Sequence, residues 1–124
     1  MTTKVSYRDL RIWQEAVGLA LTIYRVTATF PRNELYGLTS QMRRAAVSIS
    51  SNIAEGKGHN SDGDFGRFLF HARGSLLELQ TQIVIAGGLD YLPKEEVASL
   101  TSVTDALGRG LNGLIQSVRG TKVA

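Results

Sequence analysis

Polar residues that could do chemistry recur at helical spacing in two neighbouring segments of the chain. In the first segment, steps of three or four residues connect Gln41, Arg44, Ser48, Asn52 and Glu55. In the second, similar steps connect Arg67, His71, Ser75, Glu78 and Gln82. Because residues three or four apart share one face of an α-helix, each set predicts a polar stripe. Facing stripes of this kind could exchange ion pairs and hydrogen bonds, or line a polar pocket.

The two stripes would meet if their segments formed a helical hairpin. Gln41 and Arg44 would then lie near Glu78, and Glu55 would lie near Arg67. We expect these contacts to fix the register of a helical bundle or of a subunit seam. A binding pocket or a nucleic-acid contact is the alternative, and a small-molecule enzyme that uses the polar stripes is a third.

Other patterns that resemble chemical sites each lack part of the motif. The Gly-Lys-Gly sequence at 56–58 has neither the spacing nor the Ser or Thr of a Walker loop. The Asp-Gly-Asp sequence at 62–64 lacks the glutamate that completes an EF-hand loop. His59 and His71 have no second histidine at metal-ligand spacing. The chain has no cysteine and no nucleophile-elbow sequence. These patterns therefore do not indicate a phosphate loop, a calcium loop, a metal site or a nucleophilic active site.

The elements that must position the polar stripes are helices. Apolar residues at steps of three and four predict helices at about 9–29, 38–55, 62–86 and 94–118. Short connections favour antiparallel neighbours. The sequence therefore predicts one all-α domain over residues 1–124, an up-down-up-down antiparallel four-helix bundle.

Two apolar features exceed what a single bundle needs. The first helix carries two apolar stripes about 120° apart, although a helix on the outside of a monomeric bundle needs an arc only a little over 100° wide. The third helix carries an extra stripe that repeats every seven residues. We expect an oligomer interface to include residues from both features: Ile12, Leu19, Ile23, Phe70, Leu77 and Val84.

The basic residues are mostly arginines. Ten of the fourteen bases are arginine, and eleven acids leave a net charge of only +3. That excess alone does not indicate a nucleic-acid partner, although arginine pairs well with phosphates and carboxylates. Aromatic residues lie mostly in the apolar stripes, so base stacking is not indicated. Bases that fall off the core stripes are the candidates for phosphate contacts: Arg25, Arg43, Lys57, Arg73 and Arg109.

The chain has no features of a membrane or secreted protein. No apolar run approaches the roughly 20 residues that span a bilayer, and the N-terminus lacks the apolar region of a secretion signal. The absence of cysteine fits a reducing compartment. We therefore expect a cytoplasmic protein with no membrane partner.

Ordered motifs along the chain resemble one bacterial family. They are SYRDLRIWQ at 6–14, FP at 30–31, ELYGLTSQMRRAAVSI at 34–49, SNIAEG at 51–56, GSLLELQTQ at 74–82 and LNGLI at 111–115. Together they closely resemble the four-helix-bundle proteins named for intervening sequences in 23S ribosomal RNA genes. Ser50 stands where the family usually has proline, which favours a straighter second helix.

The resemblance implies a homopentamer with no enzyme activity and no cofactor. It also implies a relation in fold to the accessory proteins of diversity-generating retroelements, which work with a reverse transcriptase and RNA. Our first hypothesis is a non-catalytic oligomeric bundle that binds structured RNA, or an RNA-binding protein in an RNA–protein complex, through arginines repeated around a ring. The alternative is a protein-interaction scaffold with no nucleic-acid role, in which the arginines serve subunit seams.

Overall fold

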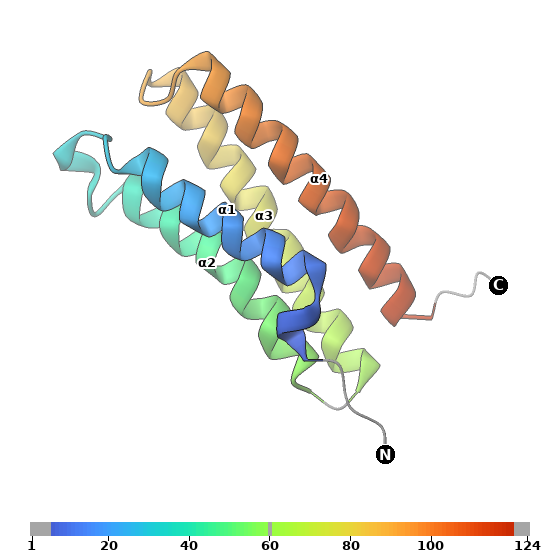
Figure 1. The fold of residues 1–124 in the computed structure, drawn as a ribbon. Coiled ribbons are helices and arrows are strands. Elements are labelled where there is room, and N and C mark those ends of the chain that lie inside the picture. The colour runs from blue at the N-terminus through green and yellow to red at the C-terminus, as the bar shows by residue number, and fades with distance from the viewer. Residues whose placement is uncertain (1–5, 60, 121–124) are drawn as a thin grey trace.

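The protein folds as an antiparallel bundle of α-helices. The computed structural model describes residues 6–59 and 61–120. Within these residues there are four α-helices, no strand and two short 3-10 turns, at Tyr7–Asp9 and Arg32–Glu34 (Figure 1). The helices are α1 (Arg11–Thr27), α2 (Leu38–Lys57), α3 (Asp62–Gly88) and α4 (Lys94–Val118). The predicted all-α up-down-up-down bundle is therefore confirmed, with helix ends within two residues of the predicted ones.

Local sequence signals explain where the later helices begin. The Ser61 hydroxyl accepts a hydrogen bond from the Asp64 backbone N–H at 3.1 Å, which caps the first turn of α3. Pro93 precedes α4, and Glu95 and Glu96 occupy its first turn, where negative charge is favourable.

One apolar core fills the space between the helices. Each helix contacts the next in sequence, and α1 also contacts α4, so the four helices enclose the core. Each helix buries one main stripe at helical spacing. The largest fully buried side chains of the described residues are mostly aliphatic: Ile23, Met42, Ile49, Ile53, Leu69, Leu76, Leu79, Ile83, Leu100, Leu111, Thr27 and Thr104.

The structure corrects the predicted role of one stripe on α1. Ile12, Leu19 and Ile23 are only 9%, 2% and 0% exposed, and they pack in the chain's own core. The prediction that they face another subunit is therefore wrong. The two α1 stripes have the same spacing, and periodicity alone does not decide which of them faces the core.

The extra stripe on α3 does lie on the surface. Phe70, Leu77 and Val84 are 36%, 57% and 67% exposed. Residues seven apart on a helix share a face and lie about 10.5 Å from one another along the axis. These three residues therefore lie in one row along α3, which we call the α3 ridge; the Arg73 and Arg119 guanidiniums lie over the Phe70 ring at 4.7 and 5.1 Å.

A side-chain contact joins the two loops at one end of the bundle. The Tyr91 hydroxyl, after α3, donates a hydrogen bond to Glu34 Oε2 at 2.9 Å, and the Tyr91 and Phe30 rings lie 5.2 Å apart. The other oxygen of Glu34, Oε1, accepts from the Leu38 backbone N–H at 3.1 Å and so caps α2. Because the hydrogen bond to Glu34, burial and the Glu34 charge all favour the protonated phenol, the pKa of Tyr91 is raised.

Candidate functional site

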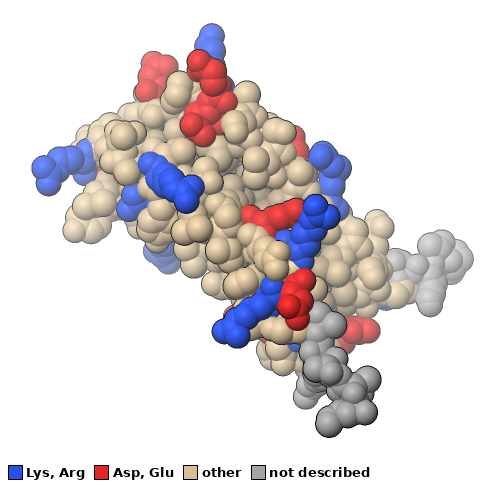
Figure 2. All heavy atoms as spheres, viewed as in Figure 1, with Lys and Arg blue, Asp and Glu red and all other residues tan. Residues whose placement is uncertain are grey.

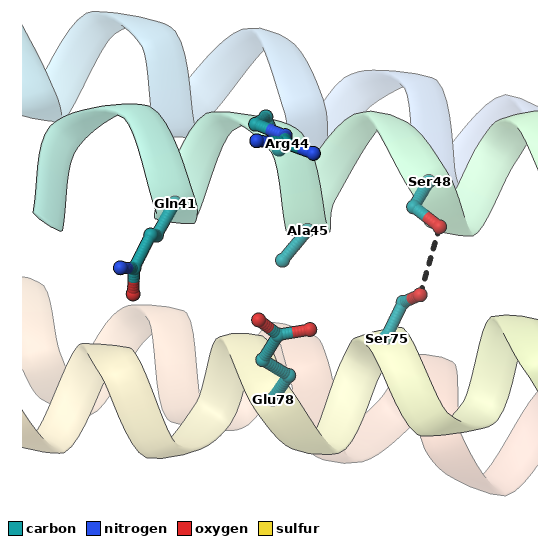
Figure 3. Close-up of a pocket in the computed structure, with 6 residues that line it drawn as sticks. All are labelled: Gln41, Arg44, Ala45, Ser48, Ser75 and Glu78. Carbon is teal, nitrogen blue, oxygen red and sulfur yellow. Dashed lines mark hydrogen bonds between the residues drawn. The ribbon is translucent and has the colours of Figure 1, made fainter. Parts of the chain in front are cut away.

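A polar cleft of about 360 Å³ lies between α2 and α3 (Figure 3). We call it the α2–α3 cleft. Ala45, Ser48 and Ser75 are small side chains at the point where the two helices face each other, and larger residues would fill this space. Six residues from the two predicted polar stripes and the adjoining core line the cleft: Gln41, Arg44, Ala45, Ser48, Ser75 and Glu78.

A hydrogen-bonded serine pair closes one end of the cleft. Ser48 Oγ and Ser75 Oγ lie 2.8 Å apart, as the dashed line in Figure 3 shows. The Asn52 amide donates to both Ser48 Oγ, at 3.0 Å, and the Ser48 carbonyl oxygen, at 2.8 Å. The Ser48–Ser75 bond crosses between α2 and α3, and the Asn52 bonds within α2 position the Ser48 hydroxyl. The crossing bond is a contact of the kind predicted to fix the register of the two polar stripes.

The predicted proximity of Gln41 and Arg44 to Glu78 is confirmed by their shared cleft. Glu78 accepts a hydrogen bond from Gln82 Nε2 at 3.3 Å, and Gln82 is only 5% exposed. Arg44, however, forms no ion pair with Glu78, because no nitrogen–oxygen distance between them is within 4.0 Å. In the part of the chain that the structure describes, the buried Gln82 Oε1 has no hydrogen-bond donor.

Among the described residues, Glu55 and Arg67 do not form the ion pair that the sequence predicted. Arg67 instead lies 3.5 Å from Asp64, one turn earlier on α3, and its guanidinium lies over the Phe68 ring at 4.6 Å. A partner three residues away on the same helix is reached without crossing between helices. His59 also contacts Asp64, at 3.6 Å.

Two of the five candidate phosphate-binding bases are held by the protein itself. Arg43 Nε donates to the Thr27 hydroxyl at 2.9 Å, and its NH2 group donates to the Tyr24 carbonyl oxygen at 3.3 Å. Arg73 NH1 donates to Asn112 Oδ1 at 2.9 Å, across the seam between α3 and α4. Both arginines are half-buried and link adjacent helices.

The other three candidates are less constrained. Lys57 is half-buried, and its Nζ atom lies 5.6 Å from the centre of the Phe65 ring. Arg25 and Arg109 are exposed, and among the described residues neither forms an ion pair or a side-chain hydrogen bond. On the face shown in Figure 2, lysines and arginines are spread among the acids and do not form one basic patch.

An apolar groove between α1 and α4 was not predicted from the sequence. This α1–α4 groove has a volume of about 590 Å³, and it is lined by Leu21 and Val103, which are 52% and 46% exposed, with Arg25 at its edge. Leu21 falls outside both apolar stripes of α1. The signal that could have found the groove is the small residue on each helix, Gly18 and Ala106.

No three His, Asp or Glu side chains come together as a possible metal site in the described ranges. None of the described helices is long and apolar enough to cross a membrane.

One comparison with known proteins identifies the family, and another supports the fold. Residues 8–113 match the family described as 23S rRNA-intervening sequence protein. The structure is similar to a crystal structure of a protein with unknown function from the S23 ribosomal protein family of Bacteroides thetaiotaomicron VPI-5482. The TM-score is 0.78 at 19% identity, over 85% of this chain and 95% of that chain. No curated protein matches the sequence. The chain therefore belongs to the 23S rRNA-intervening sequence protein family.

Proposed function

We propose that the protein is a non-catalytic, self-associating bundle that binds structured RNA or an RNA–protein complex. The observation that carries self-association is the exposed α3 ridge of Phe70, Leu77 and Val84. Single exposed apolar side chains are ordinary, whereas several of them on one helix face favour an interaction surface.

The α1–α4 groove supplies a complementary surface for the ridge of a second copy. The ridge and the groove lie on different sides of α4. Leu77 and Val84 of the ridge lie beside α4 where it packs on α3, and the groove lies where α4 packs on α1. A contact between two different surfaces of identical chains repeats head to tail and closes into a ring when the rotation permits. This arrangement agrees with the homopentamer that the resemblance implies.

The exposed arginines support an RNA partner in such a ring. Arg25 and Arg109 are exposed and have no acidic partner within the described residues. A pentamer would carry a formal charge of +15, five times the +3 of one chain. Phosphate contacts that are weak singly gain avidity when several copies engage one RNA.

Light scattering tests the assembly. We expect wild-type protein to have a mass several times 13.5 kDa. Leu77→Glu places a charge on the ridge and should dissociate the oligomer with little loss of helix content by circular dichroism. His71→Glu is the matched control, because it adds the same charge to an exposed position of α3 outside the ridge. A wild-type monomer would overturn self-association.

Titration of a labelled structured RNA at several salt concentrations tests the partner. Affinity should fall as salt rises, because bound arginines release counterions from the phosphates. Arg109→Gln should weaken binding and flatten the salt dependence. Arg11→Gln is the control, since Arg11 is already paired with Glu15 at 3.4 Å. Binding that does not depend on salt, or no binding at micromolar protein, contradicts RNA recognition.

A protein-interaction scaffold with no nucleic-acid role is the second candidate. It is favoured by the engagement of Arg43 and Arg73 in contacts between helices and by the mixed charges in Figure 2. This candidate requires an assembled wild-type protein that fails to bind RNA, so the two measurements together separate it from the first.

A further inference from the structure

The α2–α3 cleft holds two opposite charges that do not pair with each other. Arg44 lines it from α2 and Glu78 from α3, and both side chains are exposed. In Figure 3, Glu78 extends toward α2, whereas the Arg44 guanidinium lies over the α2 ribbon. Glu78 accepts one hydrogen bond, from Gln82, and the carboxylate retains unused acceptor positions. The Arg44 guanidinium forms no hydrogen bond or ion pair with the residues that the structure describes. The cleft therefore offers a cation and an anion to the same small volume.

The serine pair adds a hydrogen-bond donor to this volume. If Ser48 donates to Ser75, the Ser75 hydrogen is free, and if Ser75 donates to Ser48, the Ser48 hydrogen is free. Asn52 occupies an acceptor position of Ser48 in either case, because its amide is the donor in that bond. One hydroxyl hydrogen therefore remains for a ligand whichever way the pair is oriented.

We propose that the α2–α3 cleft binds a small zwitterion of the α-amino-acid class. The carboxylate of the ligand would lie against Arg44 and the free serine hydroxyl, and its ammonium group would donate to Glu78. The Gln41 amide, at the other end of the cleft in Figure 3, is available to a polar side chain of the ligand. The site is independent of the ridge and of the arginines assigned to RNA.

The charge balance of the cleft favours a zwitterion over a simple ion. Arg44 and Glu78 sum to zero, so an anion attracted by Arg44 meets repulsion from Glu78, and a cation meets the reverse. A zwitterion satisfies both groups at once. The volume of about 360 Å³ is at the lower end of the range for ligand sites and suits a molecule of this size.

Thermal-shift screening of the full-length protein against the free α-amino acids, followed by calorimetry, tests the proposal. We expect one or a few amino acids to bind at micromolar to millimolar concentration. The N-acetylated and carboxyl-amidated forms of a binder each lack one charge. Each should bind at least about tenfold more weakly, the loss expected for one charge-assisted hydrogen bond.

Two substitutions remove the protein charges that the proposal assigns to ligand binding. Arg44→Gln and Glu78→Gln should each weaken binding at least about tenfold. Glu55→Gln is the matched control, because Glu55 is an exposed carboxylate on α2 outside the cleft. Both cleft positions are exposed, so circular dichroism should show unchanged folding.

Three results would overturn the proposal. The first is that no amino acid binds at millimolar concentration. The second is that wild type binds the single-charge analogues as tightly as the unmodified amino acid, or that both cleft variants bind the amino acid as tightly as wild type does. The third is binding by Leu77→Glu but not by wild type, which would mean that a neighbouring copy fills the cleft.

Discussion

Gly56 allows a quantitative test of how closely α2 and α3 pack. A Cβ atom at this position would lie 2.7 Å from Cβ of Phe68 and 3.0 Å from ring atom Cδ1 of Phe65. Because Cβ of Phe68 is bonded directly to the backbone, it cannot rotate away, and α3 must shift. Overpacking of this kind costs about 1–3 kcal/mol, and the better helix propensity of alanine offsets less than about 1 kcal/mol in the last turn of a helix. We expect Gly56→Ala to lower the free energy of unfolding by about 1–2 kcal/mol.

Alanine in place of Gly113 should change the free energy of unfolding in the opposite direction. Gly113 lies inside α4, it is exposed, and, apart from its two chain neighbours and the backbone of its own helix, nothing lies within 4 Å of the position that its Cβ would occupy. Only the propensity term acts there, so Gly113→Ala should raise the free energy of unfolding by about 0.5–1 kcal/mol.

Urea unfolding followed by circular dichroism measures both changes. Protein concentration should be the same for all variants, because the proposed self-association would link stability to concentration. The denaturation midpoint should fall for Gly56→Ala and rise for Gly113→Ala with the slope unchanged. If Gly56→Ala is as stable as wild type, α2 and α3 do not approach as closely as described, and the packing argument is refuted.

Two further predictions concern single side chains. Arg43→Ala removes the hydrogen bond to Thr27 and should destabilise the fold by about 1–2 kcal/mol in urea unfolding. Arg44 is the exposed neighbour, so Arg44→Ala should change stability by less than about 0.5 kcal/mol. Equal effects of the two substitutions would contradict the assignment of Arg43 to the helix seam. Because the pKa of Tyr91 is raised above its ordinary value of 10.0, its bond to Glu34 stabilises the fold fully below pH 10.0, and that stabilisation is lost as pH rises through the raised pKa. The stability difference between wild type and Tyr91→Phe should therefore shrink in alkaline unfolding experiments, and a difference that does not change with pH would refute this contribution.

The sequence predicted the helices because their apolar residues repeat at helical spacing and their ends carry strong signals such as Ser61 and Pro93. It did not predict which stripe of α1 faces the core. The α1 stripe that runs from Leu10 to Tyr24 is as regular as the stripe that contains Ile12, yet Ile12 is buried and Tyr24 is exposed. The difference depends on how α1 is rotated against its neighbours, which is a property of the whole bundle.

The candidate site shows the same division between local and tertiary information. Helical spacing predicted that Arg44 and Glu78 lie close together, because their positions along α2 and α3 set their heights in the bundle. It could not show that they stay unpaired, since that depends on side-chain conformation. Arg43 was assigned to phosphate contacts because it lies off the apolar stripe, although the neighbouring α1 presents it with the Thr27 hydroxyl and the Tyr24 carbonyl oxygen.

The bond between Glu34 and Tyr91 has a consequence for the cooperativity of folding. The chain forms two αα-hairpins, α1 with α2 and α3 with α4, and only the connection after Lys57 joins them covalently. At the opposite end, Glu34 caps α2 and accepts the Tyr91 hydroxyl with its other oxygen. One carboxylate therefore ties the start of a helix in the first hairpin to the loop of the second. Fraying at that end exposes both hairpins together, so the two halves of the bundle should open as a single unit.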